Sequence, residues 1–388
     1  MVEEERQRSA PAVALALGIA VIGMIVAEVL GNGTFSWSQP EHWHSAAVGR
    51  AAVCFVVFGG VVLGLSTGGV APEQGQSLVS ARLAVLVRAG LLFVLGGVLV
   101  AVTESQTVIL ESFAVLVALA IAVLGWRPRR LLIVAAVLGV VGPLVVGLFH
   151  PTLADRAESV GAIPSLALTH TYPVLTWAPF LLVGLAIGRT DLTAARTRNR
   201  LLGFGFGAAV LGYGAIGLLG LTGNDPVASG TDADWVRMSA ERIPELDPAI
   251  TVMVGMSVGD APDPALDSML AAGPPSPATL LAIIGSAGVA TLILGLVLAI
   301  PQVLRRWLAP VAAVGSLPLT VYTAAILGTA GLQLDTLDRS LVLITELAVV
   351  VTGAYLWRRM AGRGPIEWFI DVVAAAATRI APASRPGE

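Results

Sequence analysis

The sequence predicts an all-α fold, a polytopic integral membrane helix bundle with about ten transmembrane helices. Hydrophobic residues make up 56% of the 388 residues and charged residues only 13%, about half the charged share of a soluble domain. The mean hydropathy is +0.83. Apolar runs long enough to cross about 30 Å of hydrocarbon recur along the chain. One aqueous core could not bury so much apolar surface, so the bilayer is the expected solvent.

Ten apolar runs predict the helices in order, and each is too long and too uniformly apolar for an alternating barrel strand. The first run follows a start of mixed charge and lacks a small-residue cleavage site, so we expect a retained helix rather than a signal peptide. The single cysteine, Cys54, lies inside the second run, which excludes a disulfide within the chain. The runs are 12–30, 46–66, 83–102, 107–125, 131–149, 172–188, 201–221, 279–300, 309–329 and 339–357.

Arginine carries all the positive side-chain charge, since the chain contains no lysine. With ten spans, the arginine-rich segments all fall on one side of the membrane, and the positive-inside rule puts that side and both termini in the cytoplasm. The formal net charge of −3 gives no reason to expect a nucleic-acid partner. The arginines concerned are Arg6, Arg8, Arg82, Arg127, Arg129, Arg130, Arg189, Arg196, Arg198, Arg200, Arg305, Arg306, Arg358, Arg359 and Arg363.

The opposite side is expected to hold the histidines and many carboxylates. Residues 1–361 are predicted as a single membrane domain, interrupted by one long outer loop at 222–278 that is rich in Gly, Pro, Asp and Ser. Residues 362–388 are predicted as a cytoplasmic tail, in which the apolar segment around Trp368 lies in the headgroup zone. The outer polar residues are His42, His44, His150, His170, Glu28, Glu104 and Glu111.

Five stretches carry a family resemblance, and they occur in order over nearly the whole chain apart from 222–278. They read GIAVIGM at 18–24, GRAAVCFVVFGGVVLGLSTGG at 49–69, THTYPVLTWAPFLLVGLAIGRTDL at 169–192, LAPVAAVGSLPLTVYTAAIL at 308–327 and GPIEW at 364–368. Together they resemble the YeiB/DUF418 branch of the membrane acyltransferases related to heparan-α-glucosaminide N-acetyltransferase.

The resemblance implies an acyltransferase of the cell envelope, in the cytoplasmic membrane of a bacterium. Such a protein would take an acyl group from the co-substrate acyl-CoA at the cytoplasmic face. It would pass that group to an amine or hydroxyl of an envelope glycan or lipid outside, with no metal. Several polar family positions are changed here, among them Ala14, Leu17, Ala325 and Asp371. This pattern is typical of a retained fold with altered or lost chemistry.

The outer candidates for catalysis are His44, His42 and Glu28. The resemblance puts a central histidine in the first outer loop, and an imidazole with a free pKa near 6.5 suits a general base. An interfacial histidine that touches lipid headgroups is an equal alternative. Arg50 begins the second helix, where an unpaired guanidinium would cost about 2.5–3.5 kcal/mol. Glu28 or Glu111 is therefore expected to pair with it, and a structural pair is favoured over substrate binding.

The inner candidates for binding acyl-CoA are Arg88 and Arg82 on the third helix, because guanidinium groups suit phosphates. Snorkelling is the alternative, more so for Arg82. The glycine pairs 59–60 and 96–97 are expected to serve close helix packing, with a slot for the pantetheine arm as the less favoured alternative. No Walker, GxGxxG, HExxH or paired-cysteine metal motif occurs.

Three functions stay open on the sequence. The first is an acyltransferase or a degenerate relative, and the second is a non-catalytic relative that binds a lipid or glycan or supports an envelope complex. The third, a transporter, is disfavoured because the titratable residues cluster at helix ends rather than at the midplane. Convergence of the loop histidines, Glu28 and Arg50 on a cavity toward Arg88 would favour the enzyme. A path filled by Val and Leu would not.

Overall fold

The structure is a computed structural model that describes residues 2–30, 49–103, 108–154, 172–218, 277–330 and 338–380. Within these ranges the chain is helical and contains no strand. His42, His44, Glu104, His170 and the predicted outer loop up to residue 276 lie outside the described residues.

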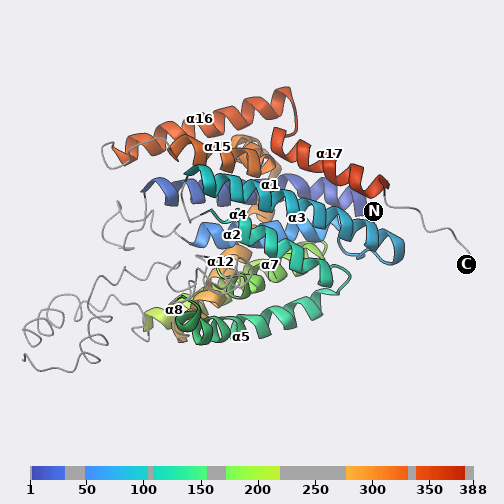
Figure 1. Cartoon of the computed structure of the whole chain (residues 1–388), viewed down its shortest axis with the longest axis vertical. Helices are drawn as coiled ribbons and strands as arrows, with labels where there is room; N and C mark the ends of the chain where they lie inside the picture. The colour runs from blue at the N-terminus through green and yellow to red at the C-terminus, as the bar shows by residue number, and fades with distance from the viewer. Residues whose placement is uncertain are drawn as a thin grey trace, which may run out of the picture.

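The helices form one bundle (Figure 1). In chain order they are α1 (Val2–Leu30), α2 (Arg50–Ser66), α3 (Gly75–Thr103), α4 (Leu110–Ala120), the 3-10 helix η2 (Ile121–Val123), α5 (Pro128–Ala154), α7 (Val174–Gly188), α8 (Ala195–Leu218), α12 (Pro277–Ala299), α13 (Gln302–Trp307), α14 (Ala309–Ser316), α15 (Pro318–Ala330), α16 (Arg339–Met360) and α17 (Pro365–Ile380).

Each of the ten predicted apolar runs coincides with a helix or a helix pair, which confirms the all-α bundle. Among the described residues, five helices are long and apolar enough to cross a membrane. There are six if α14 and α15, which meet at 89°, form one broken span. The helices α2, α4 with η2, and α7 have 10–17 residues, fewer than the roughly 20 that a span needs. The ten-span arrangement therefore stays a prediction.

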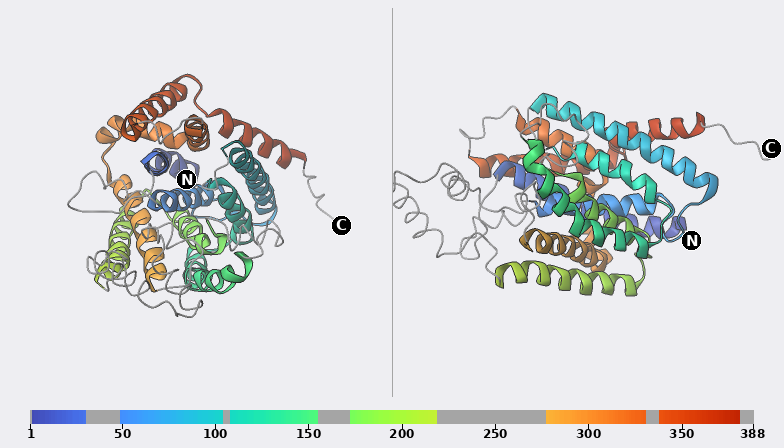
Figure 2. Two further views of the ribbon diagram at one scale, coloured as in Figure 1. Left: turned by 60° about the vertical axis from the view of Figure 1, so that its left-hand side comes forward. Right: turned by 60° about the horizontal axis from the view of Figure 1, so that its bottom comes forward.

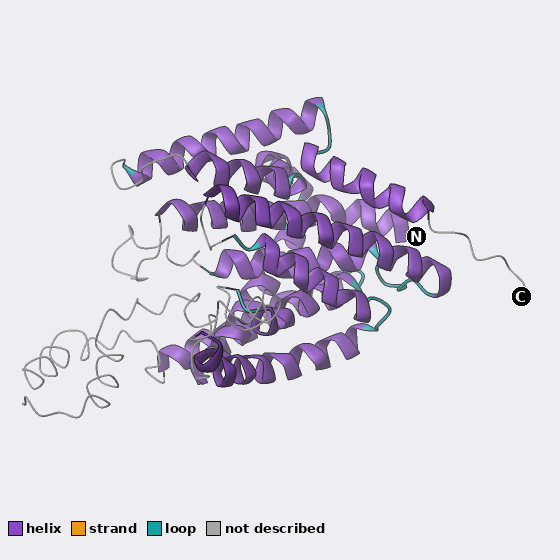
Figure 3. Cartoon of the chain, in the orientation of Figure 1, coloured by secondary structure: helices purple, strands orange, loops and turns teal. Residues whose placement is uncertain are grey.

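One end of the bundle, here called the basic end, gathers four connections between helices, three of which carry arginine. The loops that join α2 to α3, α4 to α5, α7 to α8 and α16 to α17 all lie at the end where α1 begins (Figure 3). This is the alternation that the arginine pattern requires of antiparallel neighbours. The cytoplasmic location of the basic end stays a prediction.

The centre of the bundle is built around α1, α2 and α7, with α8 and α12 side by side at one edge (Figure 2). Glycines let the backbones of α2 and α7 meet: Gly60 lies against Gly184, and Gly64 against Gly188. Both pairs have the four-residue spacing of close membrane-helix crossings. These glycines therefore serve close helix packing, as expected. Backbone atoms of the partner helix, rather than an open slot, face them.

The outer surface is that of a protein solvated by lipid. Large apolar side chains are exposed on α3, α5, α8 and α16, where water would make such a continuous apolar surface unfavourable. In α16 only Ala354 is buried. Examples of the exposed side chains are Val94, Val98, Ile133, Val137, Phe204, Phe206, Leu341, Ile344 and Val349.

Candidate functional site

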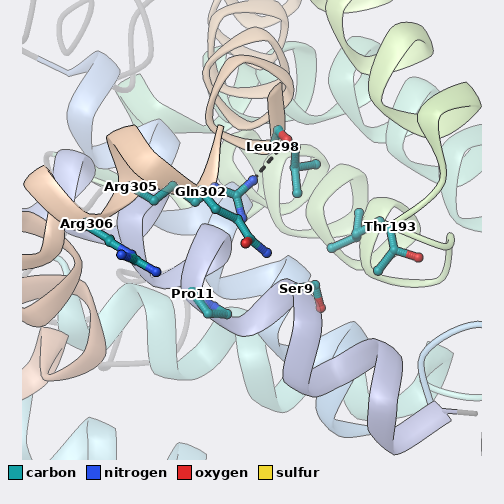
Figure 4. A pocket seen from close by; sticks show the side chains of 8 residues that line it. Ser9, Pro11, Thr193, Leu298, Gln302, Arg305 and Arg306 are labelled. Carbon is teal, nitrogen blue, oxygen red and sulfur yellow. Dashed lines mark hydrogen bonds between the residues drawn. The ribbon is translucent and has the colours of Figure 1, made fainter. Parts of the chain in front are cut away.

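A polar hollow lies at the basic end, at the corner between α12 and α13. Pro301 is extended there, with φ −60° and ψ 149°, and because it has no N–H it cannot continue α12. The corner faces the first part of α1 and the turn between α7 and α8. Together they enclose a pocket of about 580 Å³ (Figure 4), hereafter the corner pocket. Its lining is Ser9, Pro11, Leu192, Thr193, Leu298, Gln302, Arg305 and Arg306.

Arg305 holds the corner together. Its Nη2 donates hydrogen bonds to the carbonyls of Val297 (3.3 Å) and Leu298 (3.0 Å) in the last turn of α12. These carbonyls belong to the last turn, where the regular helical donors run out, although Val297 also accepts from the Ile300 N–H at 3.3 Å. A cation there also meets the negative end of the helix dipole. The Nε of Arg305 is buried and has no hydrogen-bond partner in the described part of the chain.

Arg306 is the exposed cation of the corner pocket. Within the described ranges no hydrogen bond or ion pair engages its guanidinium, and the amide of Gln302 lies one turn before it on α13. Figure 4 shows Arg306 on the Pro11 side of the pocket, with Ser9 and Thr193 across from Arg305. The pocket therefore combines two guanidiniums and an amide with apolar walls, and none of its lining residues is acidic. An anion with an apolar part fits these groups. The Thr193 hydroxyl donates to Asp191 Oδ1 at 2.6 Å just outside the pocket lining.

A buried arginine fixes the turn that carries Thr193. Arg189, only 3% exposed, donates to the carbonyls of Thr67 (2.6 Å), Gly64 (3.2 Å) and Leu124, and to the Thr67 hydroxyl (2.9 Å). The C-terminal ends of α2, of α4 with η2 and of α7 therefore share one cation. Burial lowers the pKa of Arg189 to about 10, while the nearby Glu73 raises it, so the guanidinium is charged at neutral pH.

At the opposite end, Arg50 lies over the ring of Tyr213 on α8, with the guanidinium carbon 4.5 Å from the ring centroid. The Tyr213 hydroxyl is 2.7 Å from Ser286 Oγ, which donates to the Ala282 carbonyl on α12 at 2.6 Å. This polar chain links α2, α8 and α12. Sequence reasoning missed Tyr213 and Ser286, because a lone tyrosine and a lone serine on apolar helices carry no spacing signal.

The predicted carboxylates lie elsewhere. Glu28 on α1 is within electrostatic range of Tyr322 on α15 and Glu346 on α16. Both carboxylate oxygens of Glu346 are buried without a hydrogen-bond partner among the described residues. Glu111 begins α4 and lies in the notch that Gly96 and Gly97 leave on α3. Arg50 thus contacts α8, whereas Glu28 is near α15 and α16 and Glu111 lies against α3. The pairing of Arg50 with Glu28 or Glu111 stays a prediction.

The two arginines predicted to bind acyl-CoA lie on α3, away from the corner pocket. Arg88 Nη2 pairs with Asp371 Oδ1 on α17 at 2.9 Å. Asp371, at 44% side-chain exposure, thus ties α17 to α3 through this ion pair. Arg82 is half-buried, and its Nε has no hydrogen-bond partner in the part of the chain that the structure describes. Arg305 and Arg306, which sequence reasoning used only for orientation, line the pocket instead.

Between the two ends the described interior is packed with apolar side chains. Phe58, Trp177 and Phe180 are fully buried, and a Cβ on Gly59 would touch the ring of Phe113 at 2.6 Å. This packing is what the non-catalytic hypothesis predicts for the region around α2 and α7. No family model, no curated protein and no solved structure matches the chain.

Proposed function

We propose that this protein is a membrane acyltransferase-like protein that binds acyl-CoA at its basic end. It would transfer the acyl group to an amine or hydroxyl of an envelope glycan or lipid at the opposite end. The sequence resemblance supports the reaction class, and the corner pocket supports the donor. The single observation that carries the proposal is a pocket with two guanidiniums, apolar walls and no acidic lining residue.

The chemistry of the pocket matches the chemistry of the donor. Acyl-CoA presents phosphates on one part and an apolar acyl chain on another, and guanidinium groups bind phosphate oxygens with two N–H donors at once. Arg306 is free to make this contact. Arg305 is already bonded to the end of α12, so it contributes its charge to the pocket. Leu192 and Leu298 supply apolar wall.

Binding of acyl-CoA to the purified full chain tests the proposal, with Arg306→Gln as the informative variant. The expected result is binding by the wild type and roughly tenfold weaker binding by the variant, the size of one lost charge-assisted contact. Arg129→Gln removes the same charge from an exposed site at the basic end, outside the pocket, and should leave binding unchanged. Equal losses in both variants would reduce the effect to net charge and contradict the proposal.

The Arg88→Ala variant separates this proposal from the donor site expected on α3. If acyl-CoA binds at the corner pocket, Arg88→Ala leaves binding near the wild-type value, because that guanidinium already pairs with Asp371. A loss on Arg88→Ala, with none on Arg306→Gln, would move the donor to α3.

A second candidate function is a lipid-binding or glycan-binding envelope protein without transferase activity. The packed interior around Phe58, Trp177 and Phe180 favours it, because transfer needs the donor's acyl group to reach the acceptor. Release of free CoA thiol from acyl-CoA, with and without an envelope extract, distinguishes the two. Binding with acceptor-dependent thiol release supports the transferase, and binding with no release supports the second candidate.

A further inference from the structure

A second recess lies at the basic end, on the other side of Arg305 from the corner pocket. It has a volume of about 360 Å³ and is formed by α1, the α13–α14 segment and the last turns of α16. Its basic members are Arg305, Arg358 and Arg359, with Tyr355 beside them, and Leu15 and Ala312 form part of its apolar wall. None of its lining residues is acidic.

We propose that this recess is a binding site for the headgroup of an anionic phospholipid, whose acyl chains lie along the exposed face of α16.

The basic groups suit a phosphate. The Arg359 guanidinium lies over the Tyr355 ring, 4.7 Å from its centroid, a contact that restrains the side chain without using its N–H donors. Arg358 is exposed on the neighbouring position, and within the described residues neither guanidinium has a carboxylate partner. Several guanidiniums around one recess can satisfy the oxygens of a phosphate diester.

The position of the recess argues for a lipid rather than a soluble phosphate. It lies at the end of α16, a helix long and apolar enough to span a membrane and with only 11% of its most apolar window buried. Val349, Leu356 and Met360 are exposed along that helix. A headgroup held at Arg358 and Arg359 would lie at the level where acyl chains can follow this face. A soluble phosphate would contact only the arginines of the recess and leave its apolar wall and the face of α16 unused.

The simpler explanation for these arginines is the positive-inside rule, which requires basic residues at one end but no particular arrangement. The test must therefore hold charge constant. The double variant Arg358→Gln/Arg359→Gln removes two charges from the recess. Its matched control, Arg363→Gln/Arg379→Gln, removes two exposed charges from the same end, outside the recess.

The experiment counts phospholipids retained by the full-length protein in native mass spectrometry, after reconstitution with equal amounts of phosphatidylglycerol and phosphatidylcholine. We expect the wild type and the control to retain phosphatidylglycerol preferentially, and the recess variant to bind it at least about fivefold less tightly. Equal losses in both variants, or no loss in either, would overturn the proposal. Displacement of the lipid by an equal concentration of glycerol 3-phosphate would reduce the site to a free phosphate site and overturn the lipid assignment.

A second measurement keeps the proposal testable if the recess variant does not fold. Photoreactive phosphatidylglycerol should label wild-type peptides from α14 and the end of α16, and labelling confined to other helices would contradict the site. Arg306 is not part of this recess, and Arg358 and Arg359 are not part of the corner pocket. Failure of the lipid site would therefore leave the acyl-CoA proposal standing, and the reverse also holds.

Discussion

Arg189 and Thr67 are joined twice, since the guanidinium donates to both the carbonyl (2.6 Å) and the hydroxyl (2.9 Å) of Thr67. Thr67 is the C-cap of α2 and Arg189 the C-cap of α7. The same guanidinium reaches the carbonyl of Leu124 after η2. One cation therefore joins the ends of three apolar segments, in addition to the backbone N–H groups of Glu73 and Gly69 that donate to the Thr67 and Gly64 carbonyls.

Replacement of Arg189 by Lys is predicted to destabilise the bundle by about 3 kcal/mol. Lysine keeps the charge but loses the planar fork, so it cannot reach the Leu124 carbonyl, the Thr67 carbonyl and the Thr67 hydroxyl at once. Thermal unfolding of the purified protein measures the effect, with the exposed Arg196→Lys as control. Equal thermal midpoints for the two variants would contradict the stabilising role of Arg189.

The loss caused by Arg189→Gln, which puts no titratable group at this position, should not depend on pH between about 6 and 8. Burial lowers the pKa of Arg189 to about 10, below the ordinary value of about 12.5. Both the folded and the unfolded states therefore hold this proton up to pH 8, and no proton is exchanged on unfolding. Above pH 10 the folded state holds fewer protons than the unfolded state, so the wild type would gain stability with rising pH. Thermal midpoints of both proteins at pH 6 and pH 8 check this.

Gly184→Ala is predicted to disrupt the crossing of α2 and α7. A Cβ at Gly184 would lie 1.9 Å from the Val57 carbonyl oxygen and 2.8 Å from its carbon, so the two backbones would have to separate. We expect a loss of more than about 2 kcal/mol. Gly90→Ala is the matched control, since nothing lies within 4 Å of that position, and it should be neutral or slightly stabilising. Equal stability of the two variants in thermal unfolding would show that the crossing is not this close.

Glu367→Ala is predicted to loosen the attachment of α17 to the start of α15. The carboxylate accepts from the backbone N–H groups of Leu319 (2.8 Å) and Thr320 (3.0 Å) and from the Thr320 hydroxyl. It therefore caps a helix from a distant segment, and its loss should cost about 1–2 kcal/mol. Faster amide hydrogen exchange at Leu319 and Thr320 checks this. Glu367→Gln keeps an acceptor and should fall between the wild type and Glu367→Ala.

Asp371→Asn is predicted to change stability by no more than about 1 kcal/mol. The Arg88 and Asp371 side chains are 38% and 44% exposed, so water competes with their attraction. A double-mutant cycle with Arg88→Gln measures the coupling energy between them. A coupling well above 1 kcal/mol would mean that this ion pair is shielded from water, for example by lipid.

The helices were predictable from the sequence because each apolar run is long compared with any turn. Their membrane roles were less predictable, because run length alone does not separate a full span from the short central helices α2 and α7. The break at Leu317 between α14 and α15 has a signal in Pro318, but the apolar run continues through it. The charge pattern located the basic end correctly. It could not show which arginines bind carbonyls, such as Arg189 and Arg305, and which line a pocket, such as Arg306.

The candidate site was predicted less well, for a physical reason. A pocket at a helix corner is made by residues far apart in the chain, here Ser9, Thr193 and Arg306, and no spacing within one segment encodes it. The Arg88–Asp371 pair likewise joins positions 283 residues apart. Glu367 belongs to the GPIEW motif, which predicts no contact for its carboxylate. In the structure this carboxylate caps the start of α15, which lies 48 residues earlier in the chain.

The most direct test of the central claim is to map where a photoreactive acyl-CoA attaches to the full-length protein, using peptide mass spectrometry. The account predicts labelling of peptides around Ser9 and Gln302–Arg306 at the corner pocket, suppressed by excess acyl-CoA. Competed labelling centred on Arg82 and Arg88 of α3, or no labelling that acyl-CoA suppresses, would contradict it.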